Sequence, residues 1–123
     1  MTWARNGECE LWYETFGDRS DPTLLIVNGL GSQSSNYQDA WCEMFAAEGL
    51  QVVRYDNRDV GLSSHLPGAE YTVSDMAADG MAVLDALGVE QAHVMGLSMG
   101  GMIVQMMAIE HPQRVLTLTS VMS

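Results

Sequence analysis

Residues 92–104 read AHVMGLSMGGMIV, and this stretch decides the fold. It places Ser98 between an apolar run typical of a buried strand and a second apolar run typical of a buried helix. The central residues GLSMG fit the G-x-S-x-G pattern of a nucleophile elbow, a sharp strand-to-helix turn that exposes a serine hydroxyl. An ordinary glycine-rich loop is the alternative, and the apolar flanks disfavour it. The stretch therefore predicts that Ser98 is a nucleophile and the only non-glycine residue with a positive φ.

Around this turn, apolar patterning predicts that strands and helices alternate. Strands are expected near 2–5 and at 9–16, 23–27, 51–55, 91–95 and 115–121, and helices at 37–48, 72–87 and 99–110. The first two strands should pair as a hairpin through Asn6-Gly7. The continuous run TLLIV (23–27), apolar from Leu24 on, is typical of a strand buried on both faces of a parallel sheet. This order predicts an α/β fold with a mostly parallel sheet.

The three expected helices carry separate signals. In the first helix, the residues expected to face the core are Ala40, Trp41, Met44 and Phe45. Thr72 or Ser74 can cap the second helix, and Gly88 stands just past its end. The third helix is apolar almost all round, so it is expected to be buried, and Pro112 should end it.

Composition narrows the range of partners and compartments. The chain has 123 residues, 47% of them hydrophobic, and a net charge of −11 from 5 basic and 16 acidic residues. One globular domain is expected, and the lack of basic clusters argues against nucleic-acid and anionic-membrane partners. The N-terminus has no apolar leader pattern and no run is long enough to cross a bilayer, which favours the cytoplasm. Cys9 and Cys42 are expected to be free thiols.

A serine nucleophile needs backbone N–H donors that stabilise the oxyanion it generates. At an elbow, one donor is the residue after the serine, which is Met99. The other comes from the loop after the strand over 23–27, where VNGLGS (27–32) offers two glycines and Leu30 between them. The sequence therefore predicts that Leu30 and Met99 donate the oxyanion-hole amides. A further hypothesis is that the Met99 side chain lines an acyl pocket.

Four segments resemble the N-terminal part of an α/β-hydrolase. They are LIVNGLG (25–31), RYDNRDVGLS (54–63), AHVMGLSMGG (92–101) and HPQRV (111–115). Within that superfamily the chain is most similar to the aclacinomycin methylesterase-like carboxylesterases. The resemblance implies a three-layer α/β/α fold, hydrolysis of small-molecule esters through an acyl-enzyme, and neither cofactor nor metal. Asn28 departs from the pattern, since the family usually has a histidine there, and the departure bears on how a substrate is oriented.

The resemblance also implies that two catalytic groups are missing. An α/β-hydrolase places its acid and its histidine after the serine in chain order. Both are therefore expected beyond Ser123, and residues 1–123 are expected to form the N-terminal part of one domain, truncated after the sixth strand. On its own, such a chain should be a weak hydrolase. Its last strand, over 115–121, should be an exposed edge open to self-association or to a partner chain.

None of the three histidines is expected to serve as the base. They are His65, His93 and His111. The first falls in a loop and the second within the strand that leads to the serine. The third ends the helix that begins at the serine, about 18 Å away.

Other interpretations of the sequence remain open. Gly29-x-Gly31 follows a strand and Asp56 ends the next one, as in a nucleotide-binding module, but the third glycine is missing. A non-catalytic binding or regulatory protein of the same fold is a second alternative, and cofactor-free haloperoxidase chemistry is a third. Asp56, Arg58 and Asp59 are expected to build a turn with a local ion pair rather than to transfer protons.

Overall fold

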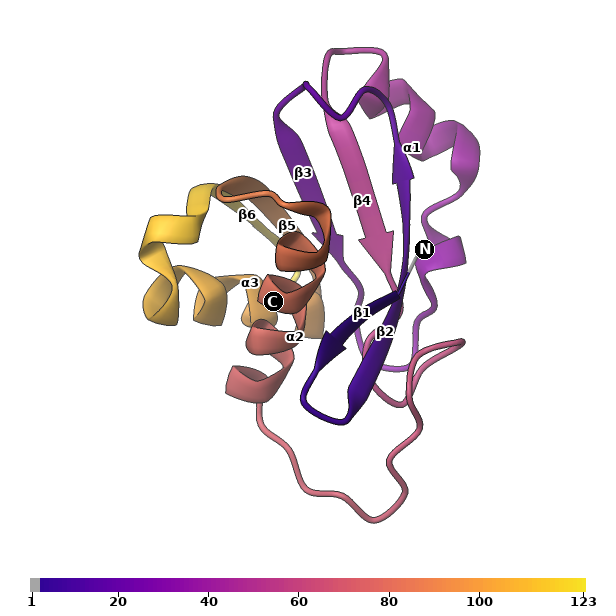
Figure 1. Ribbon diagram of the computed structural model, residues 1–123, viewed down its shortest axis with the longest axis vertical. Coiled ribbons are helices and arrows are strands. Elements are labelled where there is room, and N and C mark those ends of the chain that lie inside the picture. The colour runs from indigo at the N-terminus through magenta and orange to yellow at the C-terminus, as the bar shows by residue number, and fades with distance from the viewer. Residues whose placement is uncertain (1–2) are drawn as a thin grey trace.

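The computed structural model describes residues 3–123, which form a six-stranded sheet flanked by helices (Figure 1). The strands are β1 (Trp3–Asn6), β2 (Cys9–Phe16), β3 (Thr23–Val27), β4 (Gln51–Tyr55), β5 (Ala92–Leu97) and β6 (Val115–Val121), and the helices are α1 (Asp39–Ala46), α2 (Val73–Leu87) and α3 (Met99–Glu110). Two short 3-10 turns lie at Ser34–Asn36 and Pro112–Arg114. The predicted first strand reached back to Thr2, which lies outside the described residues.

The sheet has the order β1-β2-β4-β3-β5-β6. The β1–β2 and β2–β4 pairs are antiparallel, and the β4–β3, β3–β5 and β5–β6 pairs are parallel. Strands β4, β3 and β5 run in the same direction, so the chain segments that follow them leave the sheet at the same edge. Strand β3 lies between the other two. The predicted mostly parallel α/β sheet is confirmed, and its topology brings the loop after β3 beside the end of β5.

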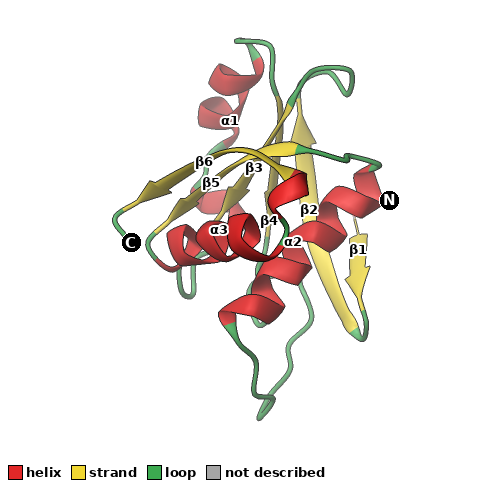
Figure 2. Ribbon diagram, turned by 90° about the vertical axis from the view of Figure 1, so that its left-hand side faces the viewer, coloured by secondary structure: helices red, strands yellow, loops and turns green. Residues whose placement is uncertain are grey.

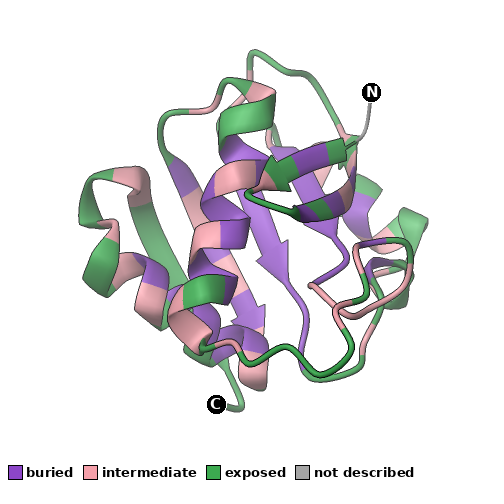
Figure 3. Cartoon of the chain, turned by 60° about the horizontal axis from the view of Figure 1, so that its bottom comes forward, coloured by how far each residue is buried: buried purple, intermediate pink, exposed green. Residues whose placement is uncertain are grey.

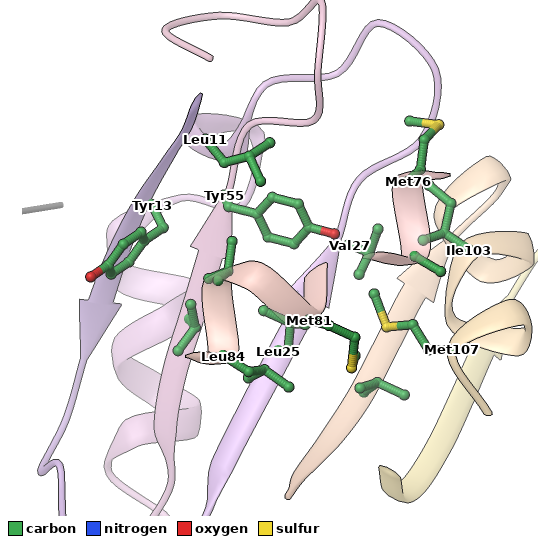
Figure 4. Close-up of a cluster of buried hydrophobic side chains, with 14 of the residues drawn as sticks. Leu11, Tyr13, Leu25, Val27, Tyr55, Met76, Met81, Leu84, Ile103 and Met107 are labelled. Carbon is green, nitrogen blue, oxygen red and sulfur yellow. The ribbon is translucent and has the colours of Figure 1, made fainter. Parts of the chain in front are cut away.

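Helices cover both faces of the sheet, so the predicted three-layer arrangement is confirmed (Figure 2). One face packs against α2 and α3 around Leu25, Val27 and Tyr55, while the other packs against α1 around Ile26 and Val52. In Figure 4 the Tyr55 ring lies between Leu11 and Val27 within the α2–α3 core. The central strands β3 and β4 are buried along their whole length, although β4 includes the polar residues Gln51 and Arg54 (Figure 3).

Helix α2 begins and ends where its sequence signals predicted. The Thr72 side chain accepts a hydrogen bond from the Asp75 N–H, and the Asp75 carboxylate accepts one from the Thr72 N–H, which together form a capping box. Gly88 ends the helix in the left-handed region, with φ 70°. Thr72, rather than Ser74, is therefore the cap.

Helix α1 is shorter than predicted, and its inward face was placed wrongly. Cys42 is fully buried and packs with Trp41 and Phe45, whereas Met44 is 69% exposed and Ala40 is exposed. At 100° per residue, positions 41, 42 and 45 share one side of the helix, and position 44 points away from its centre. Cys42 was overlooked as a core residue. Both Cys42 and Cys9 are free thiols, as predicted, and both are buried.

Several apolar side chains of α3 and β6 are exposed. Met102 and Ile109 of α3 are 49% and 72% exposed, so the prediction that α3 is buried on all sides is wrong. Leu116 and Leu118 of β6 are also exposed, at 46% and 38%, as expected for a strand at the edge of the sheet. Within residues 3–123, no helix has both the length and the apolar character needed to cross a membrane.

Candidate active site

Ser98 lies at the tip of the turn between β5 and α3, as predicted. Its backbone angles are φ 57° and ψ −119°, and the residue is exposed. The Ser98 N–H donates to the Val121 carbonyl of β6 at 2.7 Å, which ties the turn to the edge strand. Asp59 and Met122 also have positive φ, so the prediction that Ser98 is alone in this respect is wrong. The strained backbone directs the serine away from the helix that follows.

Glycines make this sharp turn possible. A Cβ on Gly96 would collide with the backbone of Gly100 and lie 2.6 Å from the Gly101 nitrogen. A Cβ on Gly100 would lie 2.7 Å from the Asn28 carbonyl oxygen and still closer to that of Val27. These contacts involve backbone atoms, which cannot rotate aside. Both glycines of the motif are therefore required by the close approach of α3 to β3 and β5.

The loop after β3 lies against the serine. A Cβ on Gly29 would lie 3.4 Å from Ser98 Cβ and 3.8 Å from the Met99 nitrogen. The Leu30 N–H, one residue on, has no hydrogen-bond partner among residues 3–123. The Met99 N–H belongs to the first turn of α3, where helical N–H groups have no partner within the helix. The loop that carries Leu30 and the Met99 N–H are thus both next to Ser98. The convergence of the two predicted donors on one oxyanion position stays a prediction.

Polar contacts fix the start of this loop. The Asn57 side-chain amide donates to the Asn28 carbonyl at 3.1 Å, and the Tyr37 hydroxyl donates to the Val27 carbonyl at 3.2 Å. Asn28 is itself buried, and its Nδ2 group has no hydrogen-bond partner among the described residues. The segments after β3 and β4 therefore hold each other in place beside Ser98.

The segment after β4 builds turns, as predicted, but its ion pair is not local. The Asp56 carboxylate accepts the N–H groups of Ser34 at 2.7 Å and Leu62 at 3.0 Å. Arg58 pairs with Asp79 of α2 through two hydrogen bonds, at 2.7 and 2.9 Å. These contacts raise the pKa of Arg58. Asp79 was missed, although it is a carboxylate next to the apolar stripe of α2 and is only 1% exposed.

Asp59 follows Arg58 in the chain and makes contacts of its own. Its carboxylate accepts the Leu66 N–H at 2.5 Å, and this bond, followed by one from the Tyr71 hydroxyl, lowers the pKa of Asp59. The Tyr71 ring also stacks on the Arg58 guanidinium, with 4.9 Å between the guanidinium carbon and the ring centroid. The backbone of Asp59 has a positive φ of 67°. The expected local pair is therefore replaced by two separate contacts.

No histidine is placed to take the Ser98 proton. His65 Nε2 is 2.9 Å from the Gly61 carbonyl, and His93 Nδ1 is 2.7 Å from Thr117 Oγ1. His111 follows the last residue of α3, at the opposite end of the helix from Ser98. Within residues 3–123, no hydrogen bond joins Ser98 Oγ to a base, and no group of three His, Cys, Asp or Glu residues could hold a metal ion.

A pocket of about 170 Å³ adjoins the oxyanion loop. Its walls include Leu30 and Met99, so the Met99 side chain does line a pocket. A larger hollow, of about 440 Å³, is lined by residues that include Trp12, Glu14 and Asp56. Neither Leu30 nor Met99 lines it. The smaller pocket is the one whose walls include both predicted oxyanion-hole residues, Leu30 and Met99.

Comparison with known proteins agrees with this geometry. The family model for the alpha/beta hydrolase fold matches residues 22–123. The chain belongs to the α/β-hydrolase fold family. This α/β-hydrolase chain is 42% identical over 116 residues to rhodomycin D methylesterase of Streptomyces peucetius, which covers 93% of this chain and 39% of that protein. It is 32% identical over 111 residues to a putative carbamate hydrolase of Variovorax paradoxus, covering 90% and 41%.

Solved structures give the same result. A hydrolase from Pseudomonas aeruginosa PA01 matches with a TM-score of 0.86 at 33% identity, over 94% of this chain and 43% of that one. The resemblance to methylesterases of this superfamily is thus confirmed. This α/β-hydrolase chain spans about two fifths of the length of the relatives it matches.

Proposed function

We propose that this chain supplies the nucleophile and the oxyanion hole of a serine hydrolase that acts on small-molecule carboxylic esters. The observation that carries the proposal is the exposed Ser98 in its strained turn, with the Leu30 loop packed against it through Gly29. The 42% identity to a methylesterase favours an ester over other acyl substrates.

In the proposed reaction, Ser98 Oγ attacks the ester carbonyl carbon. The carbonyl oxygen gains negative charge and accepts hydrogen bonds from the Leu30 and Met99 N–H groups. The first turn of α3 adds its partial positive charge on the same side. The alcohol then leaves with a proton, and water hydrolyses the acyl-serine to regenerate the free hydroxyl.

This reaction needs a base for the Ser98 proton. Because no histidine of residues 3–123 contacts Ser98, we propose that the 123-residue chain alone is a weak catalyst. Loss of the triad partners of a serine hydrolase lowers kcat about 10⁶-fold, and oxyanion stabilisation and binding provide what remains.

The test is hydrolysis of p-nitrophenyl acetate by two proteins. One is the 123-residue chain, and the other joins it to the part of the Streptomyces peucetius relative that follows the aligned segment. We expect slow turnover from the first and at least about 10³-fold faster turnover from the second. Ser98→Ala should abolish the gain, whereas Ser35→Ala, an exposed serine outside the site, should not change it. If the joined protein keeps its turnover after Ser98→Ala, Ser98 is not the nucleophile. Fast Ser98-dependent turnover by the 123-residue chain would refute the proposal that this chain lacks a base for Ser98.

A further inference from the structure

The pocket beside the oxyanion loop has a size that limits what it can hold. Its volume is about 170 Å³, and its apolar walls come from Leu30, Val60, Met76 and Met99. An apolar cavity of about 150 Å³ in another protein binds benzene. This pocket therefore accommodates a group up to about the size of one aromatic ring, and the two methionine side chains can adapt to its outline.

Three charged groups lie at this pocket, and they do not balance. Arg58 and Asp59 are wall residues, and Asp79 lies directly behind Arg58. The Arg58 charge is matched within the protein, because both Asp79 oxygens accept its hydrogen bonds. Asp59 forms no ion pair among the described residues, its acceptor bonds favour the ionised form, and the weaker influence of the His65 and Arg58 charges acts in the same direction. The formal charge of the three groups is therefore −1.

Tyr71, also a wall residue, contacts both Arg58 and Asp59. One face of its ring is covered by the Arg58 guanidinium, and its hydroxyl is bonded to Asp59. No unpaired cation thus remains to receive an anionic group, while the ionised Asp59 would repel it. The net charge of −11 on the whole chain adds to this repulsion.

We propose that this pocket receives an uncharged apolar part of the ester, no larger than about one aromatic ring, and that Asp59 excludes a group bearing a carboxylate. The assignment to an ester rests on the function proposed above. The selectivity itself rests on the pocket and its charges, and can be measured without turnover.

The experiment follows the methionine methyl groups by NMR in the 123-residue chain carrying Ser98→Ala and ¹³C-methyl methionine. The ligands are methyl benzoate and benzoate, which share one ring and differ in charge. Methyl benzoate should shift the Met76 and Met99 signals through the ring current, and leave Met44, exposed on α1, unchanged. Benzoate at the same concentration should shift none of the three. The substitutions Met76→Leu and Met99→Leu, which nearly conserve volume, assign the signals.

The role of Asp59 is tested by Asp59→Asn, which keeps the shape and removes the charge. This variant should bind benzoate about fivefold more tightly and methyl benzoate unchanged. Equal binding of both ligands by the parent chain, or shifts elsewhere than at Met76 and Met99, would overturn the proposal. Because Ser98→Ala is used throughout, a failure of the serine chemistry would not alter these results. Likewise, if methyl benzoate did not bind in the pocket, the p-nitrophenyl acetate assay would still test the proposed esterase function.

Discussion

Replacing Gly100 by alanine should destabilise the chain, because the new methyl group has no space. Its Cβ would lie 2.7 Å from the Asn28 carbonyl oxygen and closer to that of Val27. Carbon and oxygen ordinarily stay about 3.3 Å or more apart, so α3 must move away from β3 by roughly 1 Å. Overpacking of this kind costs up to about 3 kcal/mol. Alanine recovers about 1 kcal/mol through its higher helix propensity. The expected net loss is about 2 kcal/mol.

Gly101→Ala is the matched control, one residue further along the same helix. Its Cβ would meet Ser120 Oγ at 2.6 Å, a hydroxyl that can rotate aside, and Ser123 Cβ at 2.7 Å, in a residue that belongs to no helix or strand. Urea unfolding followed by circular dichroism compares the three chains. With a slope of about 2 kcal/mol per molar urea, Gly100→Ala should lower the midpoint by about 1 M, and Gly101→Ala by much less. Equal midpoints for Gly100→Ala and the parent chain, or equal losses in both variants, would refute the reasoning.

Further substitutions test the core and the caps. Tyr55→Phe should leave the free energy of unfolding unchanged or raise it by up to about 1 kcal/mol in thermal or urea unfolding, because the buried Tyr55 hydroxyl has no partner among the described residues. Asp79→Ala should cost about 3 kcal/mol in the same assay, since it leaves the Arg58 charge largely buried and unpaired. Thr72→Ala should cost about 1 kcal/mol through loss of the α2 cap. The Thr72 N–H lowers the pKa of Asp75, so this carboxylate stabilises the fold at neutral pH and loses that effect as the pH falls through the lowered pKa; the stability gap between the parent and Asp75→Asn should narrow in acid.

Local signals in the sequence predicted those features that local interactions determine. Helix α2 is the clearest case, because its cap at Thr72, its apolar spacing and its terminal Gly88 each act within a few residues. The same holds for the Ser98 turn, where the motif glycines govern how closely neighbouring segments approach. Strand β3 was predicted to the residue, since four apolar residues in succession after Thr23 are typical of a strand covered on both faces.

Features that depend on tertiary packing were missed. The partner of Arg58 is Asp79, 21 residues away in the chain, and nothing in the loop sequence distinguishes it from Asp59, the adjacent acid. The inward face of α1 was misplaced because Met44 is apolar yet 69% exposed, whereas Cys42 is fully buried against the sheet. Sequence periodicity reports which residues are apolar, and it cannot report how wide the opposing surface is.

The candidate site divides into two parts with different structural origins. The part that would stabilise negative charge is made of backbone groups, from Leu30 after β3 and Met99 after β5, and its geometry follows from the parallel pairing of those two strands. The part that would move the proton needs a side chain beside Ser98, and residues 3–123 place none there. Backbone geometry of this kind forms with the sheet itself, so an oxyanion site can exist before any base is in place. If so, a base brought to Ser98 from elsewhere would raise kcat for the ester more than it would change the binding of the neutral group in the pocket, and a separate measurement of kcat and KM in the joined protein would reveal that difference.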